Sequence, residues 1–114
     1  MVSSLKVEVS AEDRALFERD GAVLLKSALS SEWIDLVASG LDECFEEPGA
    51  MSSELATSNT LIRIDQFPAA RSAALERFIT ESPVAALVGA LLDAPVRFYM
   101  DQMFYKPAGE VMAT

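Results

Sequence analysis

The stretch VRFYMDQMFYKPAGE, residues 96–110, decides how the rest of the chain is interpreted. Residues 96–105 are rich in aromatic and branched side chains, which favour a strand, and successive strand residues point to opposite faces of a sheet. One face would carry Phe98, Met100, Gln102 and Phe104, and the other Tyr99, Asp101, Met103 and Tyr105. Lys-Pro-Ala-Gly at 106–109 then predicts a turn. We therefore expect a long strand that leads into a turn.

Composition indicates a small, acidic globular unit. The chain has 114 residues, of which 51% are hydrophobic, and its net charge is −9. Its basic residues are scattered, so we expect neither nucleic acid nor an anionic membrane as a partner. The longest apolar run, near 84–92, is shorter than the ~20 residues that span a bilayer, and the N-terminus lacks a signal-peptide pattern. We therefore expect a cytoplasmic location.

Histidine is absent and cysteine occurs once, which limits the possible chemistry. Without histidine there is no Ser-His-Asp relay and no route to most nitrogen-ligated metal sites. The single cysteine, Cys44, cannot form an internal disulfide, which favours a reducing compartment. It falls on the apolar face of a predicted helix, so we interpret it as a buried structural thiol rather than a nucleophile.

Two helices are predicted in the first half of the chain. The first spans 11–20, with Ser10 as N-cap, Asp13 facing back toward it, and Gly21 ending it. The second begins at Ser30 or Ser31 and ends before residue 48. Its one-sided apolar stripe contains Trp33, Leu36, Val37, Gly40, Leu41, Cys44 and Phe45. This spacing predicts an amphipathic helix that packs on a sheet.

The remaining elements follow from shorter patterns. We predict a strand at 22–25, a flexible loop from about 46 to 59, a strand at 60–67, a helix at 69–80, a helix that begins at Ser82-Pro83, and the strand at 96–105. This order suits a doubly wound α/β fold, or a helical layer on one sheet of a β-sandwich. No glycine-rich phosphate loop favours the former, and composition does not separate the two.

Two stretches resemble the phytanoyl-CoA dioxygenase family. FERDGAVLLKSALSSEWIDLVASGLDE, residues 17–43, is similar to the family's opening helix, strand and helix. APVRFYMDQMFYKPAGE, residues 94–110, is similar to its strand that ends in Lys-Pro-x-Gly. The resemblance implies a non-haem Fe(II)/2-oxoglutarate-dependent dioxygenase. Its α+β fold would pack N-terminal helices on strands of a double-stranded β-helix, or jelly roll.

The resemblance also implies where the iron ligands should lie. The family holds iron on a His-x-Asp pair shortly after the Lys-Pro-x-Gly turn and on a distal histidine, and this chain contains neither. We therefore expect residues 1–114 to be a single partial domain, the N-terminal portion of such an oxygenase, inactive alone. Fe(II), 2-oxoglutarate and a small-molecule substrate are expected for the full-length protein, and no cofactor for this chain by itself.

Three residues are candidates for 2-oxoglutarate or substrate contacts by this resemblance. Lys106 matches the turn lysine that contacts the cosubstrate in some members, although a surface lysine beside a turn is an alternative. Gln102 would line the cavity or bond to local backbone, and Arg63 matches a basic position in some members. Asp101 is a lone carboxylate, which we do not expect to bind metal.

A second function stays open. The chain would then be a stand-alone, non-catalytic binding or dimerisation module derived from the same fold. Such a module must cover the apolar edge of the strand at 96–105, and self-association through that edge would do so. A third option is a small doubly wound α/β protein unrelated to oxygenases.

Overall fold

The computed structural model describes residues 8–57 and 60–109 and shows an α+β fold. Its elements, in chain order, are α1 (Ala11–Asp20), α2 (Ser31–Glu46), β1 (Ser53–Thr57), β2 (Thr60–Gln66), the 3-10 turn η1 (Pro68–Ala70), α3 (Ala73–Glu81), α4 (Val84–Leu92) and β3 (Gln102–Tyr105).

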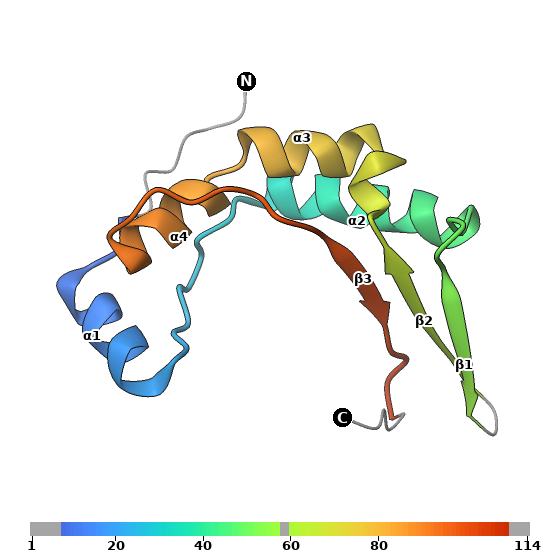
Figure 1. The fold of residues 1–114 in the computed structure, drawn as a ribbon, viewed down its shortest axis with the longest axis horizontal. Helices are drawn as coiled ribbons and strands as arrows, with labels where there is room; N and C mark the ends of the chain where they lie inside the picture. The colour runs from blue at the N-terminus through green and yellow to red at the C-terminus, as the bar shows by residue number, and fades with distance from the viewer. Residues whose placement is uncertain (1–7, 58–59, 110–114) are drawn as a thin grey trace.

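The chain forms an open arch (Figure 1). Helices α2 and α3 lie side by side across its top, the sheet forms one end, and α1 and α4 form the other. The radius of gyration is 16.2 Å, against about 13 Å for a compact domain of this length. The arch therefore exposes surface that a compact fold would bury.

Helix α1 begins and ends where the sequence predicts. The Ser10 hydroxyl accepts a hydrogen bond from the Asp13 N–H at 3.0 Å, and the Ser10 N–H donates to the Asp13 carboxylate at 2.9 Å. At the other end Gly21 has a left-handed φ of 73°, and its N–H donates to the Phe17 carbonyl. This reciprocal cap satisfies donors that a helix N-terminus leaves free. The helix contacts α4.

Helix α2 packs on α3 through the predicted apolar stripe. Trp33, Gly40 and Cys44 are its buried residues, and the Trp33 ring meets the Phe78 ring edge-on at 6.1 Å. The core that joins the helices to the sheet consists of Cys44, Leu75 and Met103, with Val37, Leu41 and Ala69 packed around it. One residue from each of α2, α3 and β3 therefore meets at this core.

The sheet is antiparallel throughout, in the order β1-β2-β3. Across β2 and β3, Arg63 pairs with Tyr105 and Asp65 with Met103. The alternate pairs are Ile64 with Phe104 and Gln66 with Gln102. Residues directly opposite one another share a face, so these two sets of pairs lie on opposite faces. Antiparallel pairing also shows that the doubly wound α/β alternative is wrong for the described residues.

Two strand predictions need correction. Residues 22–25 form no strand, and Leu24 is 75% exposed. A strand requires a neighbour for its backbone groups, and the sheet of the described residues contains only β1, β2 and β3. Of the strand predicted at 96–105, only Gln102–Tyr105 pairs with β2.

The predicted loop at 46–59 and helix at 69–80 are also only partly right. Part of the loop forms β1, an edge strand that pairs with β2 over its whole length. Polar residues are well tolerated at such an edge. A strand of this kind therefore lacks the hydrophobic pattern by which strands are predicted from sequence. The helix divides into η1 and α3, because Ser72 caps α3 by accepting from the Leu75 N–H. Helix α4 begins at Val84 with Pro83 as its N-cap, one residue after the predicted start.

In the described part of the chain, no helix combines the length and the apolar character that crossing a membrane would need.

The contact between α2 and α3 predicts the effect of a methyl group at Gly40. A Cβ atom there would lie 2.7 Å from Leu75 Cγ and 2.9 Å from Ser72 Oγ. We expect Gly40→Ala to lower the free energy of unfolding by about 1–3 kcal/mol, although alanine favours a helix more than glycine does. Urea denaturation measures this change in the free energy of unfolding.

Ser39→Ala, on the exposed side of the same helix, is the control, and its change should stay within about 0.5 kcal/mol. In a Leu75→Ala background the cost of Gly40→Ala should shrink, because the Leu75 atoms are gone and only the contact with Ser72 Oγ remains. An equal cost in both backgrounds would contradict the close approach.

Candidate functional site

Gln102 and Lys106, two of the predicted site residues, lie at the exposed side of the sheet. Gln102 is exposed and belongs to the same face of β3 as Phe104, which is also exposed. Lys106 is exposed and directly follows β3. Helices cover the opposite face, because Met103 is part of the core and the Tyr105 ring packs on Phe45 of α2, with ring centroids 4.9 Å apart.

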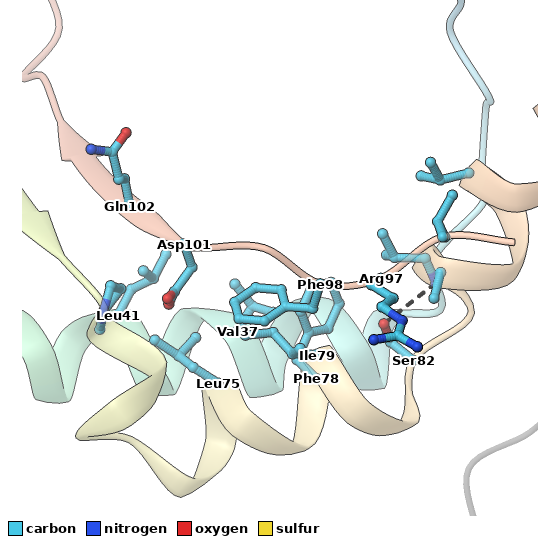
Figure 2. A pocket seen from close by; sticks show the side chains of 15 residues that line it. Val37, Leu41, Leu75, Phe78, Ile79, Ser82, Arg97, Phe98, Asp101 and Gln102 are labelled. Atoms are coloured by element: carbon cyan, nitrogen blue, oxygen red, sulfur yellow. Dashed lines mark hydrogen bonds between the residues drawn. The ribbon is translucent and has the colours of Figure 1, made fainter. Parts of the chain in front are cut away.

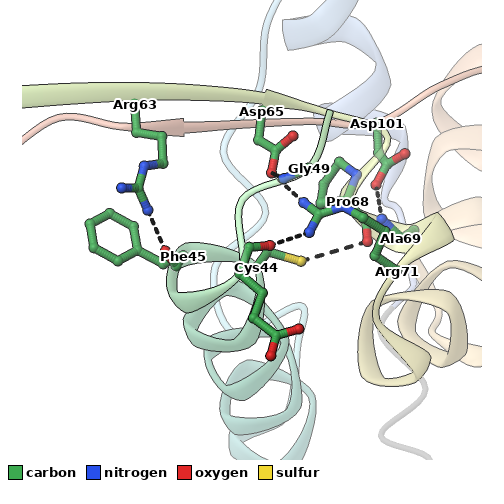
Figure 3. A network of polar contacts seen from close by, with 10 residues as sticks. Cys44, Phe45, Gly49, Arg63, Asp65, Pro68, Ala69, Arg71 and Asp101 are labelled. Carbon is green, nitrogen blue, oxygen red and sulfur yellow. Dashed lines mark hydrogen bonds and ion pairs between the residues drawn. The ribbon is translucent and has the colours of Figure 1, made fainter. Parts of the chain in front are cut away.

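Arg63, the third predicted site residue, lies on the helix-covered face (Figure 3). Its guanidinium donates to the Phe45 carbonyl near the end of α2 and lies 4.0 Å above the Phe45 ring. A cation at a helix C-terminus and over an aromatic ring is stabilised by both groups. The structure therefore places Arg63 and Gln102 on opposite faces of the sheet, and a cosubstrate role for Arg63 stays a prediction without geometric support.

A buried carboxylate near Arg63 organises the join between sheet and helices (Figure 3). Asp65 is 0% exposed and forms an ion pair with Arg71. Its Oδ2 also accepts from the Gly49 N–H at 3.4 Å, and Arg71 donates to the Glu47 carbonyl. A buried charge needs such partners because burial removes its hydration. These contacts tie β2 to the end of α2 and to the start of α3.

Asp101 also has a structural partner. Its Oδ2 accepts from the Ala69 N–H at 2.8 Å and so anchors η1 to the segment before β3. Within the described residues no group of three or more His, Cys, Asp or Glu side chains is arranged to hold a metal ion. The donor set of this chain, which lacks histidine, therefore does not fit the iron of the family it resembles.

Cys44 is a buried thiol, as predicted. It is 2% exposed, and its sulfur lies 3.6 Å from the Pro68 carbonyl oxygen that accepts its weak hydrogen bond. Burial raises the pKa of this thiol, and the nearby Arg71 opposes part of that rise. A thiol held protonated is a poor nucleophile, so the geometry favours a core role.

An apolar trough runs beneath the chain that leads into β3 (Figure 2). Its volume is about 500 Å³, and α2, α3, α4 and residues 96–102 enclose it. Its polar members are Ser82, Arg97, Asp101 and Gln102. Its apolar lining includes Val37, Leu41, Leu75, Phe78, Ile79 and Phe98. The sequence pattern placed Val37 and Leu41 on an apolar stripe but did not show that a hollow lies beside them.

Figure 2 separates the side chains of Asp101 and Gln102. Asp101 points toward α2 and α3, while Gln102 points the other way. Gln102 therefore lies at one end of the trough with its amide directed away from Asp101 and toward the exposed side of the sheet. The amide is free to meet a group that approaches from that side.

No family model, curated protein or solved structure gives a significant match to this chain. The resemblance to oxygenases stays a prediction that rests on the two quoted stretches.

The Asp65–Arg71 pair predicts an asymmetric cost of mutation. Arg71→Met would leave a fully buried carboxylate without its cation, whereas Asp65→Asn would leave a guanidinium that is already 30% exposed. We expect Arg71→Met to cost about 3–5 kcal/mol of unfolding free energy, and Asp65→Asn less. Chemical denaturation checks the order.

The control is Asp20→Asn, which removes an exposed ion pair with Arg19 on α1. Its expected change is below about 1 kcal/mol. Equal losses of unfolding free energy in all three variants would contradict the role of the buried pair in joining the sheet to the helices.

The raised pKa of Cys44 predicts a stability loss at alkaline pH. The folded state holds the thiol proton more tightly than the unfolded state, whose thiol has an ordinary pKa of 9.0. The contribution is complete below that pH and is lost as pH rises through the folded pKa. We expect the unfolding free energy of the wild type to fall more steeply above pH 9 than that of Cys44→Ala. Parallel urea titrations at each pH measure the difference, and parallel slopes would contradict it.

Proposed function

We propose that this chain supplies the N-terminal helical layer and one cavity wall of a non-haem Fe(II)/2-oxoglutarate-dependent dioxygenase that resembles phytanoyl-CoA dioxygenase. The complete protein would hydroxylate a small-molecule substrate inside a jelly-roll core, in the cytoplasm. The carrying observation is the uneven burial of the two faces at strand β3. Helices cover the face of Arg63 and Met103, while Gln102 and Phe104 are exposed on the other.

The exposed part of one sheet face supports this proposal: Phe104 is 56% exposed there, although Ile62 on the same face is buried. An antiparallel sheet with a helical layer needs a second layer wherever its other face carries large apolar side chains. Phe104 is such a side chain, and it lies between Gln102 and Lys106 in sequence. In a two-sheet core this face would line the enclosed space, with an amide and an ammonium group directed inward.

The chain alone has no catalytic step to perform. Its residues do not fit an iron centre, so its part in the proposed enzyme is to bind and orient. Lys106 would meet a carboxylate as a point charge, and Gln102 would donate or accept a hydrogen bond beside it. The helical layer would hold that wall in place through the Cys44–Leu75–Met103 core.

The alternative function is the stand-alone binding or dimerisation module. The exposed apolar run around Phe98, Tyr99 and Met100 favours it, because such a surface needs a partner in any soluble protein. The two functions differ in one respect, which is whether a chain that contains these residues binds 2-oxoglutarate.

The test begins with the source DNA beyond codon 114. The proposal expects an in-frame His-x-Asp codon pattern shortly downstream, and an immediate stop codon would count against it. The longer protein should bind Fe(II) and 2-oxoglutarate in calorimetry, whereas the 114-residue chain should bind neither.

In the longer protein Lys106→Ala should weaken 2-oxoglutarate binding about tenfold or more, because a charge-assisted hydrogen bond is lost. Lys26→Ala, an exposed lysine between α1 and α2, is the matched control and should leave binding unchanged. Equal binding by the wild type and Lys106→Ala would remove Lys106 from the site.

A further inference from the structure

Residues 96–102, VRFYMDQ, form an uncovered stretch of backbone that leads into the edge strand β3. Tyr99 is 90% exposed and Phe98 is 58% exposed. The Asp101 carbonyl accepts from the Phe67 N–H at 3.0 Å, and pairing with β2 begins only at Gln102. No strand of the described residues pairs with 96–100. An exposed run beside a sheet edge is a template for adding another strand.

The sequence of this segment is self-complementary about Tyr99. Antiparallel pairing of two copies centred there places Arg97 opposite Asp101, Phe98 opposite Met100, and Val96 opposite Gln102. Opposite charges and apolar pairs at directly opposed positions stabilise a strand pair. A two-fold axis through Tyr99 repeats each of these contacts twice.

The side chains that would form the charged pair are available. Arg97 is exposed, and no described residue forms an ion pair with it. Asp101 uses Oδ2 for the Ala69 N–H, which leaves Oδ1 for a guanidinium. Figure 2 shows both side chains on the same side of the segment, where Phe98 also lies, so the pairing requires residues 97–100 to take up regular strand alternation.

The exposed area of the chain exceeds that of a compact monomer. The accessible surface is 8334 Å², against about 6,100 Å² for a compact monomer of this mass. The excess, about 2,200 Å², is spread over the whole chain, and the exposed side chains of Phe98, Tyr99 and Met100 contribute to it. The opposite charges of Arg97 and Asp101 give this segment no net charge, so the chain's net charge of −9 is carried by residues outside it.

We propose that a second copy of this chain docks on residues 96–102, as an antiparallel strand pair across a two-fold axis at Tyr99. This pairing would use the backbone edge of the segment, whereas the oxygenase proposal uses the side-chain face of Gln102 and Phe104. The inference therefore does not rest on the proposed oxygenase function.

Charge exchange tests the partner and the register together. In sedimentation equilibrium the wild type should dimerise, and Arg97→Asp should weaken the dimer at least about tenfold, because each Asp then faces an Asp. Asp101→Arg should weaken it in the same way, and an equimolar mixture of the two variants should restore a heterodimer. A monomeric wild type at every soluble concentration, or a dimer insensitive to Arg97→Asp, would overturn the proposal.

A cross-link keeps the test decisive if Asp101→Arg fails to fold. Tyr99→Cys places two thiols opposite each other on the axis, so mild oxidation should convert this variant into a disulfide-linked dimer. Leu24→Cys, also highly exposed, is the control and should stay monomeric. Cys44 is buried and does not compete. Equal cross-linking of both variants would indicate random collision and would overturn the register.

Discussion

The ion pair between Asp65 and Arg71 is the interaction on which the rest of the structure depends. It joins the sheet to the helical layer at the point where the chain leaves β2, turns through η1 and enters α3. The same two side chains bond to backbone at Gly49 and Glu47, so the end of α2 is held in the same place. The core of Cys44, Leu75 and Met103 lies close to this join, since Arg71 and Asp65 both act on the pKa of Cys44. Polar contacts thus fix β2 to the ends of α2 and α3, and apolar contacts fix β3 to the same two helices.

The parts of the fold that could be predicted are those set by neighbours in sequence. The Ser10–Asp13 cap, the left-handed Gly21 and the stripe from Trp33 to Cys44 depend on residues three or four positions apart. The parts that could not be predicted depend on a partner far along the chain. Strand β1 exists because β2 pairs with it, and 22–25 lacks a strand neighbour within the described sheet. The site followed the same division, because the shared face of Gln102 and Phe104 follows from strand alternation, whereas the contact of Arg63 with Phe45 depends on a residue 18 positions away.

The open shape places an acidic outer surface beside an apolar trough. Helix α1 is mostly charged, while Arg97 and Asp101 are the charged residues that line the trough. This distribution leaves an apolar surface exposed beside charged helices. The face of Gln102 and the edge at Tyr99 are separate surfaces, so a cavity wall and a docking strand can coexist in one chain.

The arch also determines how the molecule should lose its structure. The end formed by α1 and α4 has few buried side chains, since α1 buries none and α4 only Leu87. The sheet end contains the ion pair and the three-element core. Cooperative units of a protein open with free energies that follow such differences in burial. Amide hydrogens of α1 should therefore exchange with solvent through local opening, long before those of β2, and the chain would behave as two units of unequal stability joined by the α2–α3 pair.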